Sequence, residues 1–372
     1  MRNDEFALEP GLVYLNHAAV APWPRRTAEA VARFAAENAA NGALHYPRWL
    51  LTEQRLRERL RTLIGARTTD EIALVKNTSE GLSIVAFGLP WATGDSVVGI
   101  ARDFPSNRVV WESLRTLGVM FRPVDVDTAL DPEAALMAAC DDSTRLLAVS
   151  WVHYVTGTAL DLDRLGRFCR SRGILLCVDA IQGLGALPID VEACGIDFLA
   201  ADGHKWLLGP EGLGVFYCRE AVRDRLTLRQ LGWHSLAHPG DYDRPDWTLT
   251  PSARRFEPGS PNLLGIHALD ASVGLLLETG IDRVTAAVRG HAAQLRAGLA
   301  TIPGADVLGS TDATRWSGIV SARLAGVDAN AFAARLATEG IVCAARRGGL
   351  RVSPHFYNLE KEIEVFINLI SR

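Results

Sequence analysis

Between residues 72 and 218, short runs of β-branched and other apolar residues alternate with longer amphipathic stretches. Seven runs have the length of buried strands: 72–75, 96–100, 120–126, 146–151, 174–178, 198–201 and 215–218. Three of the intervening stretches, 107–117, 132–139 and 161–172, space their apolar residues as helices do. This alternation predicts an α/β fold with a mostly parallel sheet of seven strands covered by helices. Ligands of such sheets bind beyond the C-terminal ends of the strands.

The pattern changes after the last of these runs. Residues 231–262 are rich in Pro, Gly, Asp and Trp and lack periodicity, and a long helical pattern begins near Leu263. We therefore predict a domain boundary near Pro261, with a large domain before it and a smaller domain, residues 262–372, after it.

The composition of the 372 residues is that of a compact enzyme. Hydrophobic residues make up 48% and charged residues 22%, and the net charge of −4 provides no basic surface of the kind that nucleic acids require. We find neither a signal peptide nor a run of about 18 apolar residues, so we expect a cytoplasmic protein with no membrane segment. The six cysteines form no CxxC pair, so no metal site and no disulfide framework are expected.

The stretch 202–212 places Lys205 in a glycine-flanked turn directly after the apolar run 196–201. Burial at the end of a strand lowers the pKa of a lysine amine, and the neutral amine can form a Schiff base with an aldehyde. Pyridoxal 5′-phosphate is the aldehyde that this arrangement suggests. Because most lysines after strands are solvated surface residues, other positions must support the hypothesis.

A second candidate lies where a helix follows the first strand. The sequence Asn77-Thr78-Ser79-Glu80-Gly81 comes after Val75, so its hydroxyl and amide groups are expected at a helix N-terminus, which favours phosphate binding. The alternative interpretation is an ordinary helix cap with a capping glutamate.

Three further residues fit a pyridoxal ring, and one fits its substrate. Asp179 directly follows a strand and is suited to pair with a protonated pyridine nitrogen, while Gln182 is suited to donate to the ring oxygen. Phe104 is suited to stack on the ring. The guanidinium of Arg351 is suited to bind a carboxylate through two hydrogen bonds.

Taken together, these motifs resemble the class V aminotransferase family, the cysteine desulfurase-like branch of the fold-type I pyridoxal-phosphate enzymes. The matching pieces follow the family order over nearly the whole chain: 14–19, 77–81, 104–107, 179–182, 202–205, 255–262, and Arg351 with 356–358. The resemblance implies an N-terminal segment, residues 1–20, that borders the active site, a large cofactor domain, residues 21–261, and a small α+β C-terminal domain.

The resemblance also implies roles for individual residues. Lys205 would form the Schiff base, and Lys205, Asp179 and His204 would be the catalytic groups. The residues that would hold the cofactor are Thr78, Ser79, Phe104, Asp179, Gln182, Asp202, His204 and Lys205, with Gly259 and Ser260 of a neighbouring subunit. A shared site of this kind implies a homodimer. The residues that would contact the amino-acid substrate are Arg351, Asn16, His17, Tyr154 and Trp233.

The chain departs from the desulfurase pattern at two places. Desulfurases carry a persulfide-forming cysteine about fifteen positions before the carboxylate-binding arginine, whereas Cys343 lies eight positions before Arg351 in an apolar run. We therefore interpret Cys343 as a core residue and do not expect sulfur transfer through it. The chain also places Tyr154 where desulfurases usually show an asparagine. These changes resemble isopenicillin-N-epimerase-like and kynureninase-like members more closely.

The first hypothesis is therefore a pyridoxal-phosphate-dependent transaminase or carbon–sulfur lyase that acts on a small amino acid. An amino-acid epimerase or a kynureninase-like hydrolase is the alternative within the same chemistry. A hypothesis of another class is a non-catalytic binding protein that kept the fold, and the intact set of Asp179, His204, Lys205 and Arg351 argues against it. The residues that choose the substrate side chain are expected in loops near His17, His45, Trp233 and Arg346.

Overall fold

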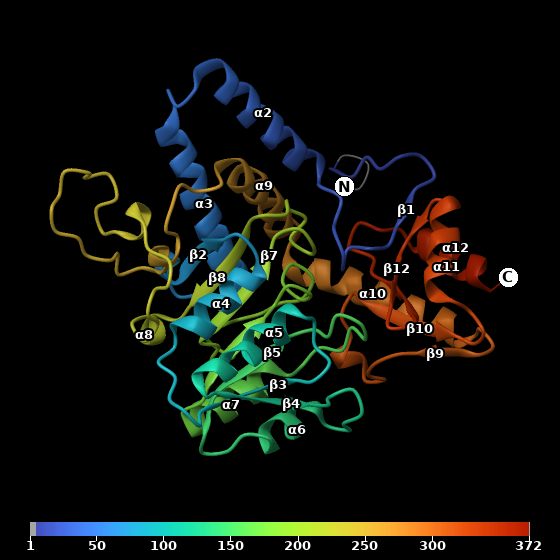
Figure 1. Ribbon diagram of the computed structural model, residues 1–372. Coiled ribbons are helices and arrows are strands. Elements are labelled where there is room, and N and C mark those ends of the chain that lie inside the picture. The colour runs from blue at the N-terminus through green and yellow to red at the C-terminus, as the bar shows by residue number, and fades with distance from the viewer. Residues whose placement is uncertain (1–4, 372) are drawn as a thin grey trace.

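The computed structural model describes residues 5–371 (Figure 1). Its centre is a sheet with the strand order β2-β8-β7-β6-β5-β3-β4. The strands are β2 (Ile72–Val75), β3 (Ser96–Ile100), β4 (Met120–Val124), β5 (Thr144–Ser150), β6 (Leu175–Asp179), β7 (Phe198–Asp202) and β8 (Gly214–Cys218). Neighbouring strands are parallel except for β8, which runs antiparallel to both β2 and β7. The predicted mostly parallel seven-stranded sheet is confirmed.

Both faces of this large sheet are buried except at its edge strand β4, because successive residues of the inner strands enter different apolar cores. On β6, Leu176 and Val178 belong to one core, while Leu175 and Cys177 belong to the other. The first core is covered by α3 (Tyr46–Ile64), α6 (Pro132–Ala138), α7 (Leu162–Arg172) and α9 (Leu263–Thr279), and the second by α4 (Thr78–Gly88) and α5 (Ser106–Glu112). Continuous apolar strands are typical of sheets covered on both sides.

The helices predicted between the strands are present, with one difference. Asp161 caps α7 and accepts a hydrogen bond from the amide of Arg164 at 3.0 Å, as its position suggested. The predicted helix 107–117 is α5 followed by a 3₁₀ turn, Ser113–Leu117, which ends at Gly118 in the left-handed conformation.

A second, smaller sheet has the order β12-β13-β10-β9. Its strands are β9 (Ala305–Val307), β10 (Val320–Leu324), β12 (Ala344–Arg346) and β13 (Gly349–Val352), and its helices are α10 (Ile281–Ala300), α11 (Ala329–Thr338) and α12 (Glu360–Ile370). They enclose a core of their own around Leu336, Val352 and Phe366. Because α9 begins at Leu263, a boundary near Pro261 fits the chain, and the division into domains stays a prediction.

The N-terminal segment joins the last part of the chain. Strand β1 (Val13–Tyr14) pairs in parallel with β11 (Ile341–Val342), and Asn16 forms a bridge with Ser353. After this segment, α2 (Arg25–Asn41) runs along the outside of the molecule before the chain turns into α3 (Figure 1).

Among residues 5–371, no single helix is long and apolar enough to cross a membrane, whereas α9 and α10 pass that test by length and composition only as a pair bent by 84°.

Candidate active site

Lys205 lies in the turn that follows β7, at the C-terminal edge of the large sheet. The turn is tight, because the amide of Gly203 donates to Asp202 Oδ1 at 2.7 Å, and a Cβ on Gly203 would lie 2.8 Å from the carbonyl oxygen of Leu213. Only 9% of Lys205 is exposed, so the predicted burial of this lysine is present.

The electrostatic surroundings keep the amine of Lys205 close to neutrality. Burial lowers the pKa of Lys205 to about 8, against an ordinary value of 10.5. That value already includes the neighbouring charges: the carboxylates of Asp179 and Asp202 raise the pKa, and the guanidinium groups of Arg351 and Arg346 lower it. A large fraction of the amine is therefore unprotonated and nucleophilic near pH 8.

Asp179 ends β6 and is 3% exposed. Its carboxylate accepts a hydrogen bond from the amide of Ile181 at 3.0 Å. Burial, and then the charge of Asp103, raise the pKa of Asp179 to about 7, and Lys205 opposes this. A cationic ring N–H beside this carboxylate would supply the missing positive partner, because an adjacent cation stabilises the charged form.

Asp103 is a second buried carboxyl group that the sequence analysis did not assign. It accepts hydrogen bonds from Ser150 Oγ at 2.7 Å, from Asn107 Nδ2 at 2.8 Å and from the amide of Phe104 at 2.7 Å. Burial raises the pKa of Asp103 despite these bonds. The sequence carried no local signal for this role, because Asp103 lies before the first residue of α5 and meets Ser150 through the pairing of β3 with β5.

The helix N-terminus predicted to bind phosphate is present at the start of α4. Asn77 Oδ1 accepts the amide of Glu80 at 2.9 Å, so the helix cap considered as the alternative also exists. Thr78 Oγ1 accepts the amide of Asp202 at 3.0 Å, and this bond ties the helix start to the end of β7. The cap uses the amide of Glu80, so the amides that a helix start offers to an anion are here those of Thr78 and Ser79.

Other residues assigned to the phosphate lie around this helix start. His204 Nδ1 lies 3.2 Å from Asp202 Oδ1 without forming a hydrogen bond. Ser79 Oγ donates to Ser106 Oγ at 2.9 Å, which adds Ser106 to the set that the sequence analysis named. Gly259 and Ser260 are exposed and lie with Lys76 and Glu80 around one surface hollow.

The carboxylate-binding role predicted for Arg351 has strong support in its geometry. The residue is 2% exposed, and its Nη1 donates to the carbonyl oxygen of Tyr154 at 3.0 Å. Its Nε and Nη2 are buried with no hydrogen-bond partner among residues 5–371. Burial, reinforced by Arg346, lowers the pKa of Arg351 to about 9. An unpaired buried guanidinium costs several kcal/mol, so a bound anion would stabilise it. The contact of Arg351 with a substrate carboxylate stays a prediction.

Comparison with known proteins places this geometry in a family. The model of the class-V aminotransferase family matches residues 13–366. The chain belongs to that family. The class V chain is 32% identical over 376 residues to a probable cysteine desulfurase of Methanothermobacter thermautotrophicus, which covers 95% of this chain and 92% of the relative. It is also 32% identical over 311 residues to the uncharacterized aminotransferase YcbU of Bacillus subtilis, which covers 83% and 80% of the two chains.

Solved structures of class V proteins confirm the fold. The apo cysteine desulfurase of Thermococcus onnurineus NA1 superposes with a TM-score of 0.89 at 26% identity and covers 100% of this chain and 96% of its own. The cystine C–S lyase C-DES superposes with a TM-score of 0.91 at 23% identity and covers 97% and 98%. These names favour the desulfurase branch, so they give no support to the expected closer likeness to isopenicillin-N-epimerase-like members.

The protein is therefore a pyridoxal-phosphate-dependent class V enzyme, and its residues fit the cofactor. Lys205 Nζ lies 5.6 Å from the centre of the Phe104 ring, whose edge-to-face partner is Tyr154. A flat ring stacked about 3.5–4 Å from Phe104 would come within reach of that amine. Asp179 would hold the ring nitrogen, while Thr78 and the start of α4 would hold the phosphate. The hypothesis of a non-catalytic binding protein is set aside.

The amide of Gln182 is largely used within the protein. Its Nε2 donates to the carbonyl oxygen of Ala18 at 3.0 Å, and its Oε1 accepts from Trp206 Nε1 at 3.0 Å. One N–H of Gln182 is left for the predicted contact with the ring oxygen. The contact with the cofactor stays a prediction.

The remaining residues predicted to contact substrate differ in their surroundings. Asn16 Oδ1 is buried and has no hydrogen-bond partner within residues 5–371, so its acceptor is free there. His17 is fully buried, and its Nδ1 and Nε2 contact Ser353 O at 2.9 Å and the Tyr357 hydroxyl at 2.6 Å. Trp233 is 39% exposed. Of the three, Asn16 has the geometry of a ligand contact, whereas His17 holds the N-terminal segment against residues 353–357.

Proposed function

We propose that this enzyme is a carbon–sulfur lyase that removes the sulfur substituent of a small sulfur-containing amino acid by β-elimination. The proposal keeps the first hypothesis from the sequence and chooses lyase chemistry over transamination. It draws on relatives and structural neighbours that carry desulfurase and C–S lyase names. The main observation in its favour is that the cysteines of this chain have raised thiol pKa values and that none lies at the position where a desulfurase carries its persulfide-forming cysteine.

No cysteine of this chain is suited to take sulfur from a substrate. Position 336, fifteen residues before Arg351, is a buried leucine in α11, and β12 and β13 are joined by the two residues Arg347 and Gly348. Burial raises the pKa of Cys343 to about 11. Burial also raises the thiol pKa of the other five cysteines: Cys140, Cys169, Cys177, Cys194 and Cys218. Since the thiolate is the nucleophile, persulfide formation on the enzyme is disfavoured.

Each residue of the site has a separate role in the elimination. Bound pyridoxal phosphate supplies an electron sink for the charge that develops at Cα. Arg351 holds the substrate α-carboxylate, and the neutral amine of Lys205 takes up the Cα proton. The Cβ–S bond breaks with its electron pair on sulfur, which leaves as a thiol or persulfide after taking a proton. Hydrolysis of the remaining three-carbon unit gives pyruvate and ammonia.

The products distinguish the lyase from the other reactions of this cofactor. The loaded enzyme should release pyruvate from cystine or S-alkyl cysteines, whereas a desulfurase forms alanine from cysteine, and an epimerase changes only chirality. The Cys343→Ala variant should retain its full rate of pyruvate release, measured by a coupled assay. Formation of alanine from cysteine that is lost in Cys343→Ala would overturn the proposal in favour of persulfide chemistry. Conversion of the substrate into its own keto acid, with the sulfur still attached and only when a keto-acid acceptor is added, would indicate a transaminase.

A further inference from the structure

The hairpin of β12 and β13 carries two arginines on one face. The register pairs Ala344 with Arg351 and Arg346 with Gly349, so the side chains of Arg346 and Arg351 lie on the same side of the ladder at diagonal positions. Diagonal neighbours in an antiparallel pair are about 7–8 Å apart. Glycine at position 349 leaves no side chain directly opposite Arg346, so the space between the two guanidinium groups is not filled by the hairpin itself.

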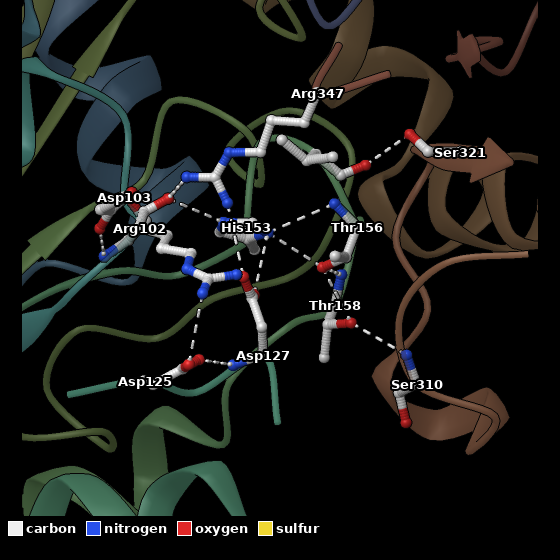
Figure 2. A network of polar contacts seen from close by, with 12 residues as sticks. Arg102, Asp103, Asp125, Asp127, His153, Thr156, Thr158, Ser310, Ser321 and Arg347 are labelled. Atoms are coloured by element: carbon white, nitrogen blue, oxygen red, sulfur yellow. Dashed lines mark hydrogen bonds and ion pairs between the residues drawn. The ribbon is translucent and has the colours of Figure 1, made fainter. Parts of the chain in front are cut away.

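Neither arginine has an anionic partner in the chain from residue 5 to 371. Arg346 donates through Nη1 to the carbonyl oxygen of Ala345, and Arg351 donates to that of Tyr154. The arginine of the intervening turn differs, because Arg347 forms an ion pair with Asp127 and donates to the carbonyl oxygen of Arg102 (Figure 2). The same face of the small sheet carries one carboxylate further along, Asp306 on β9, and its partner is Arg323 on β10. Arg346 and Arg351 therefore have no carboxylate of their own among residues 5–371.

Arg346 acts on the same groups that bind and convert substrate. Its charge lowers the pKa of Arg351 and contributes to the lowered pKa of Lys205. A substrate with a single carboxylate would neutralise Arg351 and leave Arg346 without a counter-charge. Like charges on one face of a hairpin are destabilising, and the arrangement is relieved when each guanidinium has its own anion.

We propose that the substrate is a dianion, an S-substituted cysteine whose sulfur substituent ends in a second carboxylate that binds Arg346. The α-carboxylate binds Arg351. The fixed separation of Arg346 and Arg351 on the hairpin then selects substrates by the distance between their two carboxylates. The proposal deepens the lyase function and rests on it. A disulfide-linked amino acid, with a carboxylate on each half, and a carboxyalkyl thioether of cysteine both belong to this class.

A matched pair of substrates tests the second anion. S-(2-carboxyethyl)cysteine and its neutral amide, S-(2-carbamoylethyl)cysteine, have nearly the same shape and differ in the distal charge. The loaded wild-type enzyme should show a kcat/KM at least about tenfold higher for the acid, the ratio expected from one charge-assisted hydrogen bond. Arg346→Gln should reduce the ratio to about one, and Arg346→Lys should restore part of it. Arg167→Gln, which removes an exposed arginine of α7 in the large-sheet part of the molecule, should leave the ratio unchanged.

Binding of unreactive acids separates this inference from the lyase function. Calorimetry on the loaded enzyme with glutarate and with its monoamide should give a Kd about tenfold lower for glutarate, and Arg346→Gln should abolish the difference. Pyruvate release without preference for the acid would overturn the inference and leave the lyase proposal standing. Preference for glutarate, with no elimination from any S-substituted cysteine, would overturn the lyase proposal while the dianion site remained. Equal binding of both acids by the wild type would refute the inference.

Discussion

At the scale of single residues, the site combines groups whose charges are unsatisfied in the protein alone. The amine of Lys205, the carboxyl of Asp179 and the guanidinium of Arg351 are all buried. The pKa is lowered for Lys205 and Arg351 and raised for Asp179, so each shift favours the neutral form of its group. Burial is the first cause in all three cases. A cofactor with a cationic ring nitrogen and a substrate with a carboxylate supply the opposite charges, so binding restores favourable ionisation.

The identity of the reacting lysine is open to a direct test, because the chain has only three lysines. Borohydride treatment of the loaded enzyme should attach the cofactor to Lys205 and leave Lys76 and Lys361, both exposed, unlabelled in a peptide mass map. Lys205→Ala should lower turnover by about 10³-fold, since it removes the group that moves the proton. Lys361→Ala is the control, and labelling of either exposed lysine in place of Lys205 would refute the assignment.

The lowered pKa of Lys205 predicts how cofactor capture depends on pH. The neutral amine is the reactive form, so the rate at which cofactor-free protein takes up pyridoxal phosphate should rise with pH and level off above about 8. An unperturbed lysine would still gain rate up to its ordinary value of 10.5. Stopped-flow absorbance between pH 6 and 10 measures this profile, and a rate that keeps rising beyond pH 9 would contradict the burial argument.

At the scale of elements, one loop connects the large sheet to the small one beside the site. The loop after β5 accepts hydrogen bonds from the second part of the chain at three carbonyl groups: Tyr154 from Arg351, Val155 from Ser321, and Gly157 from Ser317. Figure 2 shows a fourth contact of this loop, in which the amide of Ser310 donates to Thr158 Oγ1 at 3.1 Å. The position of the substrate arginine therefore depends on the conformation of this loop.

Gly157 is the position at which this loop tolerates least change. It has a φ of 69°, and an added Cβ would lie 2.0 Å from the carbonyl oxygen of Ile319. Gly173 is a matched control, because it has a φ of 67° with nothing within 4 Å of an added Cβ. Gly173→Ala should cost about 1 kcal/mol of stability from backbone strain alone. Gly157→Ala should lower Tm by clearly more and raise KM; equal Tm losses in the two variants would refute the steric argument.

The sequence predicts an element well when the pattern that defines it lies within a few neighbouring residues. It does not predict features that depend on how distant strands pair. The runs 72–75 and 96–100 coincide with β2 and β3, since a strand buried on both faces is a continuous apolar run. The reversed direction of β8 was not predicted, because parallel and antiparallel buried strands share the same pattern. Asp103 was not assigned, because its role depends on Ser150 and Asp179, which are brought to it by strand pairing alone.

At the scale of the whole molecule, the exposed leucines of the first helices predict self-association. Leu44 and Leu51, at the turn into α3 and in its first turns, are 70% and 62% exposed. Together with the exposed loop of Gly259 and Ser260, they support the homodimer implied by the family resemblance, which stays a prediction.

Light scattering should find a particle of about 81 kDa, twice the chain mass of 40.3 kDa. Leu51→Glu should weaken that particle, because it would bury a charge at the interface. Leu130→Glu, on a fully exposed loop elsewhere, should not. A monomer at micromolar concentration would refute the dimer.

The pairing of β1 with β11, and of Asn16 with Ser353, determines when the N-terminal segment can dock during synthesis of the chain. The ribosome makes the first partner of each pair more than 300 residues before the second. At about 5–20 residues per second, that delay is on the order of half a minute. The large sheet has all its strands by residue 218 and can form in that time, while the segment carrying Asn16 waits undocked. A chain cut short by a translation error would thus hold the lysine and lack both the docked segment and Arg351, so such fragments would be unable to bind substrate productively.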